Sequence, residues 1–154
     1  MRRKDRQTRD VAAIAEIIRD SLVCRLALSE DNSPYVVPLC FGYEENTLYF
    51  HSSLEGKKID ILKKNGNVCF EFDIDHHVVK DERACKWSMK YRSVIGFGKA
   101  SFVQDPEEKM KGLNAIMKQY SGRSFDYPES ALEATAIIKV EIESMTGKQN
   151  GYQA

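Results

Sequence analysis

The stretch HSSLEGKKID, residues 51–60, places a histidine, two serines and two lysines where a strand pattern gives way to a helix pattern. Gly56 frees the backbone to turn, and the next residues expose N–H groups without partners inside the helix. Lys57 and Lys58 stand at this helix start, where the macrodipole disfavours cations. A bound phosphate would reverse that balance, because it accepts the free N–H groups and neutralises both lysines. The alternative is that both lysines extend into water.

Two other strand patterns contain residues that suit a ligand site. In YVVPLCF, Pro38 removes a backbone donor, which indicates an edge strand, a bulge or the border of a cavity. A flat cofactor lying there would use the free backbone groups of Leu39 and Cys40, although the proline on its own favours an ordinary edge strand. In YRSVIGFG, Arg92 and Ser93 project to opposite faces of one strand. One of the two can reach a ligand while the other meets solvent or an interface.

Other kinds of site find little support. His76 and His77 are adjacent on an extended chain and point apart, and the four cysteines form no CxxC pair, so no metal site is predicted. There is no G-x-S-x-G elbow and no Walker phosphate loop. Cys85 and Trp87 share a segment that either covers a ligand or pins itself onto the core. A bound cofactor would supply the reactive groups that the side chains of this sequence do not provide.

The elements that position these residues alternate strands with few helices. Apolar residues recur at helical spacing after Thr8 or Asp10, which are candidate caps. The predicted helices cover residues 11–22, 55–64 and 106–120, and the second is expected to end in a left-handed cap at 65–66. The predicted strands cover residues 23–29, 35–43, 47–52, 67–75, 91–105 and 135–145, with turns at 31–34 and 44–46, a loop at 75–87 and a bend or bulge at Gly96 and Gly98. Without βαβ alternation, this order predicts a mainly β fold, a small antiparallel barrel with peripheral helices.

Composition bounds the classes of partner. The 154 residues predict one domain, 1–154, with 42% hydrophobic and 30% charged residues, as in ordinary globular proteins. The formal net charge is zero, so the chain as a whole offers no electrostatic case for nucleic acid or an anionic membrane. No apolar run approaches the length of a membrane span, and no hydrophobic signal core follows the charged N-terminus. A cytoplasmic location is expected.

Three stretches together resemble a known family. They are MRRKDR, YVVPLCFGYEENTLYFHSSLEGKKIDIL and CKWSMKYRSVIGFGKA, and they occur in order over residues 1–125. They resemble the pyridoxamine 5′-phosphate oxidase-related flavoproteins, in particular the nitroimidazole-resistance (Nim-type) branch. The resemblance implies an FMN-binding split barrel that forms a homodimer with two flavin sites at the subunit interface.

The resemblance also assigns roles to the candidate residues. It implies backbone contacts between the isoalloxazine ring and four successive residues, Val37, Pro38, Leu39 and Cys40. It implies that the flavin is lined by Phe50, His51 and Ser52, that its phosphate is held by Lys57 and Lys58, and that Tyr91, Arg92 and Ser93 approach from the same or the partner chain. His51 becomes the expected catalytic residue, because its imidazole can exchange a proton as the flavin changes redox state. Many Nim-type relatives have histidine where Lys57 stands, so Lys58 is expected to carry most of the phosphate contact.

The function implied is an FMN-dependent oxidoreductase. It would take electrons from a donor such as NADH or NADPH and pass them to a small acceptor, in a nitroreductase-like reaction. The alternatives are a flavin-binding or storage module without turnover, and haem binding as in some split-barrel relatives. The C-terminal residues ESMTGKQNGYQA lack the Arg/Trp signature of true pyridoxamine phosphate oxidases, so vitamin B6 oxidation is not expected.

Overall fold

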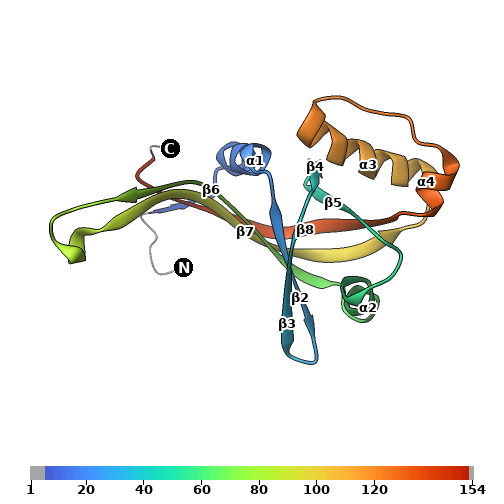
Figure 1. Cartoon of the computed structure of the whole chain (residues 1–154), viewed down its shortest axis with the longest axis horizontal. Helices are drawn as coiled ribbons and strands as arrows, with labels where there is room; N and C mark the ends of the chain where they lie inside the picture. The colour runs from blue at the N-terminus through green and yellow to red at the C-terminus, as the bar shows by residue number, and fades with distance from the viewer. Residues whose placement is uncertain (1–5, 153–154) are drawn as a thin grey trace.

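One antiparallel sheet forms the body of the molecule, and helices lie around it (Figure 1). The structure is a computed structural model that describes residues 6–152; most of the MRRKDR run lies outside this range. The strands are β1 (Gln7–Thr8), β2 (Cys24–Glu30), β3 (Ser33–Leu39), β4 (Gly42–Glu44), β5 (Thr47–Ser52), β6 (Asn67–Val79), β7 (Ser88–Val103) and β8 (Ala136–Asn150). The helices are α1 (Val11–Asp20), α2 (Lys57–Lys64), α3 (Pro106–Ser121) and α4 (Glu129–Glu133).

The strand order explains why the barrel is split. The strands run β3-β2-β6-β7-β8-β5-β4, with β1 added on β8, and every pairing is antiparallel. β3 and β4 follow each other in the chain but occupy the two ends of this order. The sheet therefore curls without pairing its own ends, and the predicted mainly β split barrel with peripheral helices is confirmed.

The expected continuous strand at 35–43 is wrong, because the chain crosses from one end of the sheet to the other at residues 40–41. Phe41 is fully buried there, and its N–H donates to the hydroxyl of Tyr120 at 3.0 Å. The same hydroxyl donates to the carbonyl of Leu22 at 2.9 Å. A side chain on α3 thus holds the crossing between β3 and β4 in place.

The two tight turns that flank this crossing are shorter than expected. Asp31 and Asn32 have φ of 49° and 63°, and Glu45 and Asn46 have φ of 49° and 60°. Two consecutive left-handed residues form the hairpin turn whose twist matches that of its strands. β3 therefore begins at Ser33, two residues earlier than the sequence pattern indicated.

The predicted loop at 75–87 is confirmed for residues 80–87 and wrong for residues 75–79, which belong to a strand. β6 continues to Val79 and β7 starts at Ser88, so these strands form a long arm closed by a short 3₁₀ turn at Ala84–Lys86. The pairing register shifts between Ile74 and His77, and Asp75 in between has a φ of 59°. This bulge interrupts the period of two, which hid the strand in the sequence. Figure 1 shows the arm projecting beyond the body of the molecule.

Two clusters of buried side chains form the core. The larger fills the barrel with residues from β2, β5, β6, α1 and α2, including the fully buried Leu26, Phe50 and Phe70. The smaller lies between the outside of the sheet and α3, and includes Tyr49. Gly96 is required beside the larger cluster, since a Cβ there would lie 2.1 Å from the ring of Phe70.

The prolines and glycines expected to mark the ends or bends of elements agree with the structure in some places and not in others. α3 begins with Pro106, and a register shift between β7 and β8 lies at Gly98, as predicted. A left-handed Gly122, which the sequence analysis did not single out, follows the end of α3. The expected left-handed cap at the end of α2 is wrong, because Asn65 is extended with a φ of −142°. Gly66 instead allows close approach to β7: a Cβ at Gly66 would lie 2.7 Å from the carbonyl oxygen of Ala100.

Candidate functional site

A surface groove of about 310 Å³ lies between β3 and the segment that joins β5 to α2, and we call it the β3–α2 groove. Its lining residues come from two segments that are 13 residues apart in the chain. They are Tyr35, Val37, Pro38, Leu39, Ser52, Ser53, Glu55, Gly56, Lys57 and Lys58. Six of the residues predicted to contact a cofactor are thus brought together: Val37, Pro38, Leu39, Ser52, Lys57 and Lys58.

The start of α2 opens into this groove without a side-chain cap. Gly56 precedes the helix with a φ of 121°, a conformation that other residues rarely adopt. No side chain among residues 6–152 accepts a hydrogen bond from the first turn of α2. By contrast, Asp10 caps α1 by accepting from the N–H of Ala12, and Asp105 caps α3 by accepting from the N–H of Glu108. The α2 N–H groups are therefore available to an anion.

The two lysines at this helix start have different surroundings. Lys58 is half-buried, and this burial lowers the pKa of its ammonium group. Within residues 6–152 no carboxylate forms an ion pair with Lys58. Lys57 is exposed and its Nζ lies 4.7 Å from the ring centroid of Tyr35, within range of a cation–π contact. A half-buried ammonium without a counter-ion is stabilised when an anion binds beside it.

The other wall of the groove is an open sheet edge. β3 pairs with β2 on one side and is the last strand of the sheet on the other. Pro38 lies in this edge strand, as one of the sequence interpretations predicted. Ser53 donates a hydrogen bond to the carbonyl of Glu55 at 2.7 Å, which holds the turn before α2. The groove thus combines a phosphate-type anion site with unpaired backbone groups, and these residues fit a flat, phosphorylated ligand.

Comparison with known proteins identifies the family. The family model described as pyridoxamine 5′-phosphate oxidase matches residues 10–149. This chain belongs to the pyridoxamine 5′-phosphate oxidase family. No curated protein matches it in sequence.

Solved structures of similar proteins support the same family. A candidate 5-nitroimidazole antibiotic resistance protein from Bacteroides thetaiotaomicron is 38% identical, with a TM-score of 0.84 over 93% of this chain and 86% of that one. A flavocytochrome from Azotobacter vinelandii has a TM-score of 0.85 at 20% identity, over 99% of this chain and 72% of that one. An FAD- and haem-binding protein from Mycobacterium smegmatis has a TM-score of 0.85 at 18% identity, over 96% and 74%. The last two likenesses show that the fold is shared.

Six of the residues that the resemblance assigned to the flavin site do not border the groove: Cys40, Phe50, His51, Tyr91, Arg92 and Ser93. Phe50 is fully buried in the larger core cluster, so its side chain packs in the barrel and does not line a ligand surface. His51 is exposed, and by strand alternation it lies on the face of β5 opposite to Ser52. Cys40 is exposed just beyond the end of β3.

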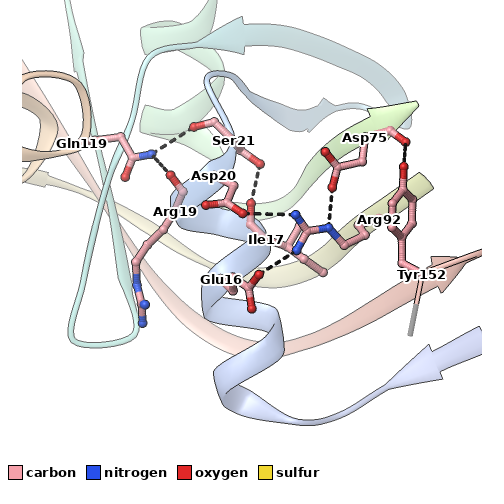
Figure 2. A network of polar contacts seen from close by, with 9 residues as sticks. All are labelled: Glu16, Ile17, Arg19, Asp20, Ser21, Asp75, Arg92, Gln119 and Tyr152. Atoms are coloured by element: carbon pink, nitrogen blue, oxygen red, sulfur yellow. Dashed lines mark hydrogen bonds and ion pairs between the residues drawn. The ribbon is translucent and has the colours of Figure 1, made fainter. Parts of the chain in front are cut away.

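Arg92 forms a network with three carboxylates on the inner face of β7 (Figure 2). Its Nη1 donates to Glu16 at 3.0 Å and its Nη2 donates to Asp20 at 3.2 Å, both on α1. Its Nε donates to Asp75 at the bulge of β6, and the hydroxyl of Tyr152 donates to the carbonyl of Asp75 at 2.8 Å. The arginine side chain is 19% exposed. In this chain Arg92 therefore joins α1 to the β6–β7 pair.

Tyr91 and Ser93 point to the other face of β7, away from Arg92. A hydrogen bond with Lys148 is the main cause of a lowered pKa of the Tyr91 phenol. Neither residue lines the β3–α2 groove formed by the described part of the same chain. Their predicted role at the flavin therefore requires the partner chain.

Arg92→Ala is expected to lower the free energy of unfolding by about 1–2 kcal/mol, because three partly exposed carboxylates lose their shared partner. Thermal unfolding followed by circular dichroism measures this. Lys111→Ala is the control, since it removes a single exposed ion pair with Glu45 and is expected to leave the melting temperature close to that of the wild type. Equal melting temperatures for the two variants would contradict a structural role for Arg92.

Four residues that line the groove were not among the predicted cofactor contacts: Tyr35, Ser53, Glu55 and Gly56, the last of which the sequence marked only as a turn. The period of two along β3 gives a signal for Tyr35, because it shares a face with Val37 and Leu39. Ser53 and Glu55 belong to the irregular turn before α2, where no periodicity applies.

None of the helices in residues 6–152 has the length and apolar character of a membrane span.

Proposed function

We propose that this chain binds FMN in the β3–α2 groove and acts as a flavin-dependent oxidoreductase. The observation that carries the proposal is that three features border one groove: an uncapped helix start, a Lys58 that has no ion pair in the described part of the chain, and the open edge of β3. The first two features suit a phosphate, and the third suits the polar edge of a flavin ring. Membership of the pyridoxamine 5′-phosphate oxidase family supports a phosphorylated cofactor.

FMN is preferred to FAD because of charge. FMN ends in a phosphate that is close to a dianion at neutral pH, whereas each phosphate of FAD carries a single charge. Lys57 and Lys58 offer two positive charges beside the positive end of α2. This concentration of charge at one point is matched best by a terminal dianion.

The flavin supplies the electron transfer when it is bound, and the chain supplies binding, orientation and proton handling. Lys58 and the first turn of α2 hold the phosphate, and the edge of β3 aligns the ring. His51 is proposed as a group that exchanges protons with a substrate, since it is exposed to solvent two residues from Ser53 in the groove wall. A homodimer would bring Tyr91 and Ser93 of the partner to the flavin.

The proposed acceptor class is small nitroaromatic compounds. The solved relative that is 38% identical is described as a candidate 5-nitroimidazole antibiotic resistance protein, and its likeness spans most of both chains. Reduction of a nitro group consumes electrons and protons together. His51 adjoins the groove-lining Ser52 in the chain, and an exposed imidazole is suited to delivering such protons.

A purified sample tests both parts of the proposal. We expect the protein to bind FMN, to lose the flavin absorption band when NADH or NADPH is added without oxygen, and to regain it when a nitroimidazole is added. The measurement is the absorbance of bound flavin at each step. Bound FMN that neither nicotinamide bleaches would favour a storage module, and absence of FMN binding would overturn the cofactor assignment. His51→Ala is the matched variant: we expect it to retain FMN and to slow reoxidation by the nitroimidazole.

A further inference from the structure

The β3–α2 groove covers one side of a flat ligand and leaves the other side open. Its lining residues come from β3 and from the segment between β5 and α2, with no second layer above them. Among these lining residues Tyr35 is the one aromatic side chain, and the ammonium group of Lys57 lies over its ring. Within the described chain, the groove therefore offers no free ring to stack on a flavin.

A free aromatic ring is found at the end of the β6–β7 arm, which we define as residues 77–90. Trp87 is 52% exposed there, although its indole N–H is already satisfied by the carbonyl of Asp81 at 2.6 Å. That hydrogen bond fixes the orientation of the ring through its N–H edge and leaves the faces of the indole available for stacking. Val78 and Met89 beside it are also exposed. An oriented tryptophan with about half its surface in water is typical of a binding contact.

The arm does not serve the groove of its own chain. Figure 1 views the molecule with its longest axis horizontal, and the tip of the arm lies at one end of that axis, beyond α1. α2 lies on the opposite side of the β2–β3 hairpin. Trp87 and the start of α2 are thus separated along the length of the sheet, so a contact between them needs a second copy of the chain.

The outer face of β7 offers a surface for that second copy. Ile95 and Phe97 alternate on this face with exposures of 43% and 54%, in line with Tyr91 and Met89. Large apolar side chains on a sheet face are normally covered, and here no helix of the described chain covers them. If the two-fold axis of a dimer passes through this face across the length of the sheet, the two sheets run in opposite directions and the end of one lies beside the opposite end of the other. Such a dimer would carry each arm toward the groove of its partner.

We propose that Trp87 completes the flavin site in trans: the arm of one protomer lays the indole over the flavin held in the partner's groove. This inference rests on the proposed function, because it assumes that the groove holds a flavin. It adds a residue to the site and explains why the arm is long. The flavin is then bound between the edge of β3 on one side and an aromatic ring of the second chain on the other.

Two measurements on the full-length protein test the contact. Trp87 is the only tryptophan of the chain, so intrinsic tryptophan fluorescence reports on this position alone. We expect saturation with FMN to quench most of this fluorescence, because a flavin stacked on an indole accepts its excitation. We also expect Trp87→Ala to weaken FMN affinity about tenfold, as for other stacked rings, and Trp87→Phe to restore it to within about threefold.

A mixed dimer separates a contact in trans from one within the chain. Chains carrying Lys58→Ala and Trp87→Ala are co-expressed with different tags, and the heterodimer is isolated. In trans, one of its two sites combines an intact Lys58 with an intact Trp87, and the other site carries both changes. We therefore expect about one site of wild-type FMN affinity per heterodimer, and none in either parent homodimer.

Each alternative outcome has a separate meaning. A heterodimer without any site of wild-type affinity would overturn the contact in trans, as would a monomeric protein that binds FMN normally. Unchanged FMN affinity in Trp87→Ala would also overturn the inference and leave the proposed function intact. A wild-type protein that binds no FMN would overturn the proposed function itself. Circular dichroism of each variant confirms that the fold is retained in the comparison.

Discussion

Lys58→Ala is expected to weaken FMN binding by about 10-fold to 100-fold, because a charge-assisted contact to phosphate contributes about 1.5–3 kcal/mol. Lys58 is the lysine whose ammonium group is half-buried beside the uncapped start of α2, with no ion pair within residues 6–152. Its replacement removes the charge that faces the phosphate and leaves the helix N–H groups in place. Isothermal titration of the apoprotein with FMN measures the change.

Lys63→Ala provides the matched control on the same helix. Lys63 lies in the last turn of α2, and it borders a different cavity together with Leu54 and Phe102. The two substitutions remove the same charge from the same helix, one at its start and one in its last turn. We expect Lys63→Ala to bind FMN as the wild type does. Equal weakening in both variants would indicate a general charge effect and contradict a phosphate site at the helix start.

The contrast between the two adjacent lysines also follows from their neighbours. Lys57 already has a partner, the ring of Tyr35, whereas Lys58 is partly desolvated and has no ion pair among residues 6–152. An ammonium group that already contacts an aromatic ring gains less free energy from binding a phosphate, because the new contact partly replaces the cation–π contact. An ammonium group without such a contact keeps the full gain. The structure thus favours Lys58 as the main phosphate contact, in the direction that the family resemblance implies.

Much of the groove could be predicted from local sequence. Gly56 followed by two lysines marks an unusual helix start within a few residues, and Pro38 marks an edge strand by removing one backbone donor. Such signals depend on the residue itself and its immediate neighbours. The turns at 31–32 and 45–46 belong to the same class, since aspartate and asparagine tolerate left-handed conformations.

Other features depend on contacts between distant residues and left no local signal. The crossing at Phe41 is held by Tyr120, which lies 79 positions further along the chain. The strand pattern at 35–43 gives no sign of this contact, so one strand was predicted where there are two. The arm was hidden for another reason: the bulge at Asp75 shifts the alternation, and polar residues occupy the arm where no core requires apolar ones.

The orientation of β5 shows why alternation alone does not locate a site. Leu48 and Phe50 point into the barrel, and Tyr49 on the opposite face packs in the second cluster with α3. Both faces of the strand are therefore apolar at this point. A period of two separates Phe50 from His51, but it does not tell which of the two faces a ligand. That choice needs the packing of α3 on the outside of the sheet.

Phe50→Ala is consequently expected to act on stability and not directly on the flavin. The ring of Phe50 is fully buried in the barrel, so its removal leaves a cavity and costs about 3–5 kcal/mol of the free energy of unfolding. We expect the melting temperature to fall by about 10 °C in thermal unfolding of the apoprotein. Phe50→Leu keeps most of the volume and is expected to cost less, which provides a measurable variant if Phe50→Ala does not fold.

His51→Ala is the neighbouring control, because it changes an exposed residue on the opposite face of the same strand. Its expected cost in stability is below about 0.5 kcal/mol. The two positions should therefore have different effects. Phe50 variants lose stability, and the His51 variant loses activity without losing stability. A Phe50→Leu protein that melts like the wild type and binds FMN much more weakly would contradict this assignment. That result would mean that the ring of Phe50 leaves the core to meet the flavin.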